Sequence, residues 1–400
     1  MTIFIIAYAC EPGKTSEPGV GWNVVKGMAE RHRLKVLTRA NNRDAIMAAP
    51  SVPGVEWLFF DLSPTLCRMK KRIPFGAQIY QELWNQAAAK KYADEMRDCD
   101  VVHQLTFGAA FFTPWAAANA HRFVWGPLGG GDKPVPFVFT RKMGVVSFAK
   151  ELFYRLVSRT ACRGTWWSRR LRAKTDAIIF RTREFASRMP VREGTQVSVV
   201  GETAYTEQVS ERKYDMASGP LRVVMVTRLM PHKAPDFAIE AFARFTRDGG
   251  DGVLTVCGSG SLSGRIRKIA VKAGVGDKVN FLGQVKHDRV LEELKRSDVM
   301  LHLSFREGGS WSILEAMAHG LPVICQKASG MDDMVADDCG SKITASTPDE
   351  LVATAAKHLM AYYADRNLIM RQGLAAQRRV AEVYRWQNIV CAIDAAYEKL

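Results

Sequence analysis

Two permanently charged side chains follow an apolar run that ends at Val226. Arg228 and Lys233 stand in the segment Thr-Arg-Leu-Met-Pro-His-Lys, directly before a helix that the sequence predicts over 236–246. The free N–H groups and the dipole of a helix N-terminus favour an anion, and two cations beside them strengthen that preference. This arrangement predicts a cradle for a diphosphate group. Because Arg and Lys are common on protein surfaces, a solvated loop is the alternative interpretation.

A glycine-rich acidic segment follows a later apolar run over 299–304. It reads Arg-Glu-Gly-Gly-Ser-Trp-Ser-Ile-Leu-Glu, which places Glu307 in a loop and Glu315 in the opening turns of a predicted helix. Gly308 and Gly309 allow the backbone to approach a ligand closely. The two carboxylates can accept hydrogen bonds from sugar and ribose hydroxyls, so the segment predicts a sugar-binding loop. A favourable interaction of the acids with the helix dipole is the alternative.

The elements that must position these loops follow from an alternation of short β-branched runs with helix-length segments. Such alternation is typical of parallel sheets with helices on both faces. The first series of runs spans 3–9, 34–38, 55–60, 101–103, 123–125, 177–180 and 197–200. After a polar segment over 205–220, the second series spans 222–226, 253–257, 279–282, 299–304, 322–325 and 342–344.

We therefore predict an α/β protein with two Rossmann-like, doubly wound domains that face a central cleft. The first domain covers residues 1–205 and the second covers 206–384, and a C-terminal helix over about 385–400 crosses back onto the first. Ligands of such sheets bind at the carboxyl ends of the strands. Both charged loops follow predicted strands, so they are placed where chemistry is expected.

Composition and length agree with this organisation. The 400 residues are 47% hydrophobic and 24% charged, which is enough for a large core and more than one ordinary domain. The eight cysteines never have a metal-type CxxC spacing, and the N-terminus does not resemble a signal peptide. We predict a reduced, cytoplasmic protein. The most apolar stretch, 107–120, is too short for a membrane span and contains Pro114.

Positive charge is concentrated in the first half of the chain. Residues 1–200 hold 30 Lys and Arg against 16 Asp and Glu, while the whole chain has a net charge of +15. Within that half, residues 141–174 combine ten basic residues and one acid with the aromatic residues Phe148, Phe153, Tyr154, Trp166 and Trp167. Contact with an anionic membrane surface, a groove for an acceptor phosphate, nucleic-acid binding and a merely solvated face are all compatible with this mixture. No nucleic-acid-binding module accompanies the charge, so we predict membrane contact and no nucleic-acid partner.

Two further patterns have weaker chemical implications. Gly19 and Gly21 precede a predicted helix as in dinucleotide-binding loops, but Val24 occupies the position of the third glycine. Their alternative interpretation is the simple start of a helix. Asp98 and Asp100 form an acid pair that precedes its strand instead of following it. Since no other cluster of acids or histidines has ligand spacing, we predict catalysis without a metal.

Together, the charged loops resemble the signature of family 4 retaining glycosyltransferases of the two-domain GT-B architecture. The matching positions are Arg228, Lys233, Glu307, Glu315 and the segment 316–323, which reads Ala-Met-Ala-His-Gly-Leu-Pro-Val. The resemblance is strong over 221–348. It is weaker in the first domain, where segments 17–21, 103–108 and 125–131 look like a subgroup that builds bacterial exopolysaccharide, O-antigen or capsule.

The resemblance implies transfer of a hexose, with retention, from a GDP-sugar or UDP-sugar to a lipid-linked saccharide acceptor at the inner face of the cytoplasmic membrane. No cofactor is implied. The first domain would bind the acceptor and the second the nucleotide sugar. Arg228 and Lys233 would hold the diphosphate, Glu307 would contact the transferred sugar, and Glu315 would contact the ribose. Further donor contacts are implied for Gly308, Gly309, Ser310, Gly19, Gly21 and Gly258.

One departure from the family concerns the acceptor or sugar side of the site. Many relatives have a histidine near the donor sugar where this chain has the glycine-rich segment 126–130. The candidates on this side are His103, Gly129 and Gly130, although His103 is equally compatible with a structural role at a strand end.

Other functions explain less of the sequence. Another GT-B enzyme, such as a sugar-nucleotide epimerase or a phosphorylase, would share the fold without an acceptor at the membrane. A non-catalytic protein that binds anionic surfaces would explain the charge but not the four matching residues of the charged loops.

Overall fold

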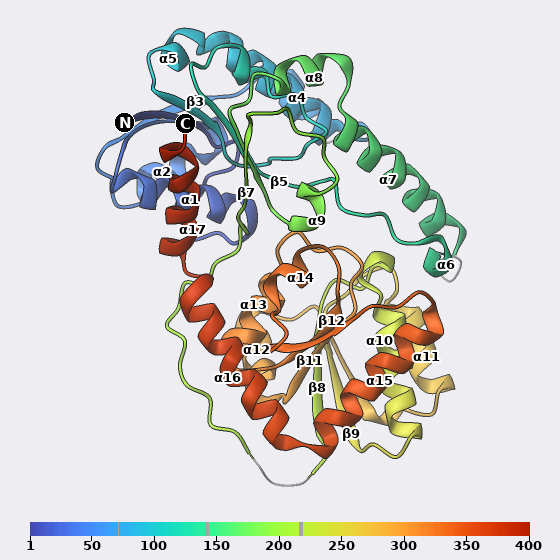
Figure 1. Ribbon diagram of the computed structural model, residues 1–400. Coiled ribbons are helices and arrows are strands. Elements are labelled where there is room, and N and C mark those ends of the chain that lie inside the picture. The colour runs from blue at the N-terminus through green and yellow to red at the C-terminus, as the bar shows by residue number, and fades with distance from the viewer. Residues whose placement is uncertain (71, 141–143, 216–218) are drawn as a thin grey trace. The chain divides into compact units, whose positions relative to one another are not determined.

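The computed structural model describes residues 1–70, 72–140, 144–215 and 219–400, which form two compact units (Figure 1). The first unit comprises Met1–Asp132, Leu156–Glu202 and Trp386–Leu400, and the second comprises Lys133–Arg155 and Thr203–Arg385. The predicted boundaries of 1–205 and 206–384 need one correction. Residues 133–155 belong to the second unit because their aromatic side chains pack there: the Phe139 ring lies 4.9 Å from Phe305 and 5.9 Å from Phe237.

The first unit is built on a seven-stranded parallel sheet in the order β3-β2-β1-β4-β5-β6-β7. Its strands are β1 (Thr2–Ile6), β2 (Arg33–Arg39), β3 (Val55–Phe60), β4 (Val101–Gln104), β5 (Phe123–Leu128), β6 (Ala177–Phe180) and β7 (Gln196–Val199). The chain order reverses between β1 and β4, which are paired. Both strands are largely buried, and this explains the continuous apolar sequence Ile3–Ile6 of β1.

Helices cover this sheet. They are α1 (Ser16–Ala29), α2 (Arg43–Ala48), α3 (Pro64–Met69), α4 (Gly76–Lys91), α5 (Ala93–Arg97), α8 (Trp166–Arg172), α9 (Arg183–Ala186) and α17 (Trp386–Glu398). The C-terminal helix α17 lies beside α1 within this unit (Figure 1). Gly27 permits their close contact, because a Cβ atom there would lie 2.6 Å from Val390. Asp394 on α17 also accepts hydrogen bonds from Arg31 at 2.9 Å and His32 at 2.7 Å.

The second unit has a six-stranded parallel sheet in the order β10-β9-β8-β11-β12-β13. Its strands are β8 (Leu221–Val226), β9 (Gly252–Cys257), β10 (Val279–Gly283), β11 (Val299–His302), β12 (Val323–Gln326) and β13 (Gly340–Ile343). Its helices are α6 (Phe137–Thr140), α10 (Pro235–Arg247), α11 (Ser263–Lys272), α12 (His287–Arg296), α13 (Trp311–Ala318), α14 (Ser329–Met334), α15 (Pro348–Ala364) and α16 (Arg366–Val383).

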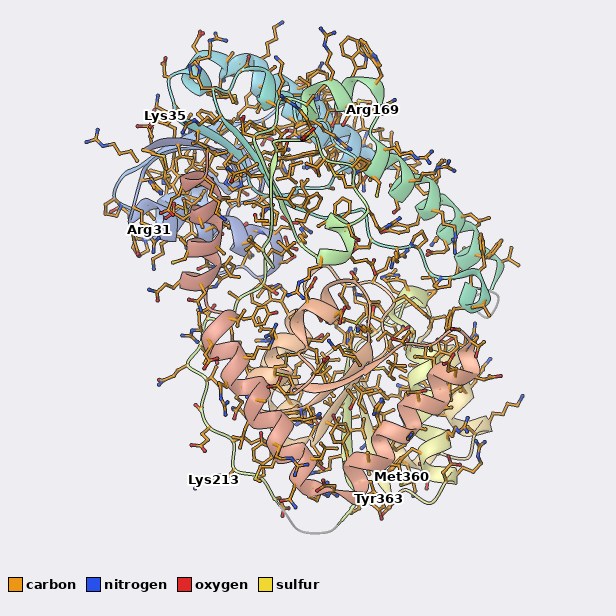
Figure 2. All side chains as sticks on the ribbon, viewed as in Figure 1. Arg31, Lys35, Arg169, Lys213, Met360 and Tyr363 are labelled. Carbon is orange, nitrogen blue, oxygen red and sulfur yellow. The ribbon has the colours of Figure 1, made fainter. Side chains whose placement is uncertain are left out.

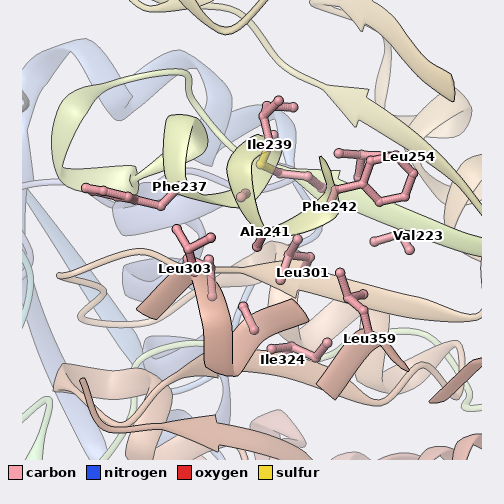
Figure 3. Close-up of a cluster of buried hydrophobic side chains, with 14 of the residues drawn as sticks. Val223, Phe237, Ile239, Ala241, Phe242, Leu254, Leu301, Leu303, Ile324 and Leu359 are labelled. Carbon is pink, nitrogen blue, oxygen red and sulfur yellow. The ribbon is translucent and has the colours of Figure 1, made fainter. Parts of the chain in front are cut away.

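The core of the second unit lies between this sheet and helices α10 and α15. Val223, Leu254 and Leu301 from the strands meet Phe242 from α10 and Leu359 from α15 (Figure 3). All five side chains are almost completely buried. This packing fixes the carboxyl ends of β8 and β11, from which the two charged loops leave the sheet.

Helix α7 (Val145–Arg163) is divided between the two units at Leu156. It is the 19-residue helix that contains much of the basic segment. Within the described part of the chain, neither α7 nor any other helix has the length and apolar character that crossing a membrane requires.

Candidate active site

A pocket of about 320 Å³ lies at the carboxyl ends of the strands of the second sheet. Loops that follow β8, β9, β10 and β11 all contribute to its lining. The lining residues are Val226, Thr227, Arg228, Lys233, Cys257, Gly258, Gln284, Val285, Val290, Glu307, Gly309, Ser310, Trp311 and Ser312. Six of the residues singled out from the sequence therefore meet in one cavity: Arg228, Lys233, Gly258, Glu307, Gly309 and Ser310.

The two charged loops are joined to each other through the backbone and the side chains. The Phe305 N–H donates to the His232 carbonyl at 2.9 Å, and the Ser304 hydroxyl donates to the same carbonyl at 3.2 Å. The Lys233 ammonium then donates to Oε1 of Glu307 at 2.5 Å. Lys233 ends a single 3₁₀ turn directly before α10, so its side chain is placed beside a helix N-terminus.

The Lys233–Glu307 pair is largely withdrawn from water, with side chains 10% and 11% exposed. Burial alone would raise the pKa of Glu307, but His302 and Lys233 outweigh it and lower that pKa to about 2. Burial lowers the pKa of Lys233, and Glu307 opposes that shift. Glu307 is therefore ionised at neutral pH, in a pocket whose other charged lining residues, Arg228 and Lys233, are cations.

His302 is a site residue that the sequence did not reveal. It is the last residue of β11, is 2% exposed, and places Nε2 2.9 Å from Oε1 of Glu307. Because Glu307 is ionised, Nε2 is the donor in this contact. Nδ1 of His302 is buried without a hydrogen-bond partner among the described residues. Both interactions of the carboxylate use Oε1, and no described residue bonds to Oε2. Oε2 is the oxygen that remains for a ligand.

The backbone of the Glu307 loop is held by the first residues of α14. The Glu307 carbonyl oxygen accepts hydrogen bonds from the Gly330 N–H at 2.6 Å and from the Ser329 hydroxyl at 2.7 Å. Ser310 caps α13 by accepting a hydrogen bond from the Ile313 N–H at 3.4 Å. Gly308 is part of the same loop but does not line the pocket, whereas Gly309 does.

Gly258 and Glu315 differ in how they relate to the pocket. Gly258 lines it with a φ of +140°, and a Cβ atom there would lie 1.9 Å from the Thr227 carbonyl oxygen, so only glycine fits. Glu315 lies on α13 outside the lining set and accepts a hydrogen bond from His287 at 2.8 Å. Burial raises its pKa, and His287 opposes the shift. Its contact with a ribose stays a prediction.

Gly19 and Gly21 lie inside α1, which corrects the expectation of a loop before a helix. A Cβ atom would lie 2.0 Å from the Lys14 carbonyl oxygen at the first position and 2.3 Å from that of Ala9 at the second. Both glycines are thus required by close packing of α1 on the loop after β1. This structural requirement accounts for them without a ligand.

His103 also requires a correction, because it is completely buried. Nε2 lies 2.7 Å from the Gly126 carbonyl oxygen and Nδ1 lies 2.5 Å from the Tyr397 hydroxyl. Burial lowers the pKa of His103 to about 4, against the opposing effect of the Gly126 hydrogen bond. A neutral imidazole with both nitrogens engaged is a structural group, so the alternative role at a strand end fits the geometry.

The remaining candidates on the acceptor or sugar side are Gly129 and Gly130. A Cβ atom on Gly129 would lie 3.1 Å from Cδ of Arg181, and Gly130 has a φ of +85°. Arg181 itself is held by Glu202 at 2.8 Å and by Glu17. The positive φ favours glycine at position 130, the Arg181 side chain limits the space beside position 129, and ligand contact at either position stays a prediction.

Part of the basic segment has a structural role instead of a surface role. Arg172 is buried, donates to the carbonyls of Cys162 and Ala110, and places its guanidinium 5.3 Å from the Trp125 ring centroid. Burial lowers its pKa to about 10, against the opposing charge of Cys162. In contrast, Arg169 is exposed on α8 (Figure 2). Residues 141–143 lie outside the described part of the chain.

The last prediction about the site is that it works without a metal. In the described ranges, no three His, Cys, Asp or Glu side chains gather as a metal site requires. Catalysis without a metal stays a prediction.

Comparison with known proteins finds similarity to glycosyltransferases in the second unit. Residues 207–377 match the family described as "Glycosyl transferases group 1". The D-inositol 3-phosphate glycosyltransferase of Geodermatophilus obscurus is 28% identical over 200 residues, which cover 47% of this chain and 42% of that protein. A GDP-mannose-dependent alpha-(1-6)-phosphatidylinositol monomannoside mannosyltransferase of Mycobacterium tuberculosis is 26% identical over 189 residues, which cover 46% of this chain and 48% of that protein. The chain thus spans about half the length of these curated relatives, or less.

Solved structures extend the similarity in fold over the whole chain. The lipopolysaccharide outer core galactosyltransferase WaaB has a TM-score of 0.63 at 15% identity, and each chain is covered completely. Anabaena HepE, solved in complex with UDP, has a TM-score of 0.61 at 16% identity with the same coverage. These structures confirm the predicted GT-B architecture, and the match of residues 207–377 supports the resemblance to glycosyltransferases. The chain has the GT-B fold, and its residues 207–377 are similar to the glycosyl transferases of group 1.

Proposed function

We propose that this protein transfers a hexose, with retention, from a GDP-sugar or UDP-sugar to a lipid-linked saccharide acceptor at the inner face of the cytoplasmic membrane. The observation that carries the proposal is the buried Lys233–Glu307 pair, which shares one pocket with Arg228. Two cations that face a cavity suit a diphosphate, and an ionised carboxylate with one free oxygen suits a sugar hydroxyl. The curated relatives named above, whose names include GDP-mannose and a phosphoinositide, support a nucleotide-sugar donor and a lipid acceptor.

The proposed chemistry needs no strong protein base. The bond between the anomeric carbon and the β-phosphate oxygen breaks, and a bond to the acceptor hydroxyl oxygen forms on the same face. The departing phosphate takes the hydroxyl proton. Arg228 and Lys233 stabilise the charge that develops on the leaving diphosphate, so their interaction is stronger in the transition state than in the ground state. Glu307 orients the sugar through Oε2 while His302 and Lys233 hold Oε1.

Contact with an anionic membrane surface is part of the same proposal. In the first unit, Trp166 and Trp167 are 59% and 60% exposed, and Arg163, Arg169 and Arg170 are exposed near them. Exposed tryptophans beside arginines suit the interface between lipid headgroups and water. A lipid-linked acceptor is reached from such a surface.

Donor binding and product stereochemistry test the proposal directly. We expect UDP or GDP, and one of their hexose conjugates, to raise the melting temperature through preferential binding to the folded protein. Proton NMR of the product should then show the anomeric configuration of the donor. If neither nucleotide nor any of their common sugar conjugates stabilises the protein, the proposed donor class is wrong.

A further inference from the structure

Helix α7 has an exposed apolar side within the second unit. Val145 is 85% exposed, Val146 69%, Leu152 44% and Phe153 49%. Lys150 is exposed among them, and the only acid between residues 133 and 155 is Glu151, which is 5% exposed. An apolar surface with a cation and no exposed acid suits an anionic lipid surface. This surface favours a lipid partner over an acidic or neutral protein, because it has no polar group that would select a particular protein.

The buried side of α7 contacts Arg306, the residue that precedes Glu307. Glu151 accepts hydrogen bonds from Nη1 of Arg306 at 2.8 Å and from the Val135 N–H at 2.7 Å. The Arg306 guanidinium also lies 3.7 Å from the ring centroid of Tyr154, one turn along the helix. Arg306 is 14% exposed and Glu151 6% as side chains, so water screens this ion pair weakly.

A second contact ties the same loop to residues 133–155. The ring of Phe305, the residue before Arg306, lies 4.9 Å from that of Phe139 on α6. Two consecutive loop residues are therefore held by this segment, and the next residue, Glu307, reaches the pocket. The position of the Glu307 backbone thus depends on α6 and α7 as well as on Ser329 and Gly330.

We infer that α7 is a membrane-responsive element that positions Glu307 through the Glu151–Arg306 ion pair. Docking of the exposed side of α7 on an anionic lipid surface stabilises the helix in place, and the helix in turn stabilises the loop. Glu151 and Arg306 are positioning residues, since they act through Glu307 and touch no reacting atom. This inference rests on the proposed function, whose catalytic loop it regulates. By linkage, a ligand that orders the loop must strengthen docking on the membrane by the same factor.

Hydrogen exchange of residues 303–312 tests the inference without any donor sugar. We expect vesicles of phosphatidylethanolamine and phosphatidylglycerol to slow exchange in this loop by at least about fivefold, while phosphatidylcholine vesicles leave it unchanged. Glu151→Gln should bind the same vesicles yet lose the loop protection. Glu211→Gln, which alters an exposed acid of the same unit, is the matched control and should behave as the unaltered protein. Equal protection in Glu151→Gln, protection by an RNA homopolymer instead of vesicles, or no protection in the unaltered protein would each overturn the inference.

The dependence of kcat on vesicles provides a second test, because a purely structural role of Glu151 would not produce such a dependence. Phosphatidylglycerol vesicles should raise kcat of the unaltered protein, and Glu151→Gln should lose this increase while its donor KM stays unchanged. Arg306→Lys, which keeps the charge, should retain part of the increase. The double variant Val145→Ser and Val146→Ser keeps the ion pair but weakens docking, so it should keep the basal kcat and lose the increase. A rise of kcat in the double variant equal to that of the unaltered protein would contradict the inference. Loop protection without any sugar transfer would instead contradict the proposed function alone.

Discussion

Each sheet carries a buried histidine on a strand next to the point where the chain order reverses, and the two histidines have opposite surroundings. His103 on β4 bonds to a backbone carbonyl and a tyrosine hydroxyl, so its network is neutral and complete. His302 on β11 bonds to an ionised carboxylate that also faces a cationic pocket, and its second nitrogen has no described partner. Equal burial therefore does not identify a site. The charge of the partner and the presence of a cavity distinguish the two.

Substitutions of Lys233 and Glu307 are expected to have the largest effect on catalysis. We expect Lys233→Ala and Glu307→Gln each to lower kcat by about 100-fold to 1000-fold, because each removes electrostatic stabilisation in a site shielded from water. Release of UDP or GDP from the donor that supports turnover measures the effect. Turnover within about threefold of the unaltered protein in either variant would refute the assigned roles.

Acid unfolding tests how much the ionised form of Glu307, the partner of His302, contributes to stability. The pKa of Glu307 in the folded protein, about 2, lies below the ordinary value, so its ionised form stabilises the fold above about pH 4.3. That contribution, roughly 3 kcal/mol, disappears as the pH falls from about 4.3 towards 2. Urea unfolding between pH 2 and 6 should show a smaller loss of stability over this window in Glu307→Gln. The control Glu211→Gln should follow the unaltered protein.

His302 is the next test. We expect His302→Phe to lower kcat by about 10-fold to 100-fold with little change in donor KM, because Glu307 then loses one of the two donors that fix Oε1. His302→Gln retains an N–H donor and should recover part of the loss. Equal kcat values for the two variants would show that the hydrogen bond does not position Glu307.

His103 should respond in the opposite way. In His103→Leu, the Gly126 carbonyl and the Tyr397 hydroxyl lose their buried partner, which should lower the free energy of unfolding by about 2 kcal/mol. The kcat of the folded variant should stay unchanged. Urea unfolding and turnover of the same preparation measure both quantities, and normal stability with lost turnover would return His103 to the active site.

The smallest expected effect concerns the basic segment of the first unit. Arg169→Glu and Arg170→Glu should each weaken binding to phosphatidylglycerol vesicles by about 1 kcal/mol or more, with nucleotide affinity unchanged. Arg172→Glu is not a matched variant, because Arg172 is buried and its loss would destabilise the fold. Sedimentation with vesicles measures the change, and unaltered binding would contradict membrane contact through α8.

Much of the fold was predictable because buried parallel strands have a strong sequence pattern. All thirteen strands lie within a few residues of the predicted runs. The convergence of Arg228, Lys233 and Glu307 was also predictable, since both loops follow strands that pair as β8 and β11. His302 was not, because a single histidine at the end of an apolar strand has no spacing that distinguishes a site from a core. The placement of 133–155 depends on Phe139 and Glu151 contacts that are remote in sequence.

The position of α17 in the first unit has a consequence for biosynthesis. The seven-stranded sheet is synthesised well before the helix that lies on α1, because most of the second unit lies between them in the sequence. Until then, Gly27, Arg31 and His32 lack the partners that α17 supplies. The first unit thus cannot reach its native packing until the second unit has been synthesised, and a nascent chain stalled before Trp386 should bind chaperones and be cut by proteases within α1.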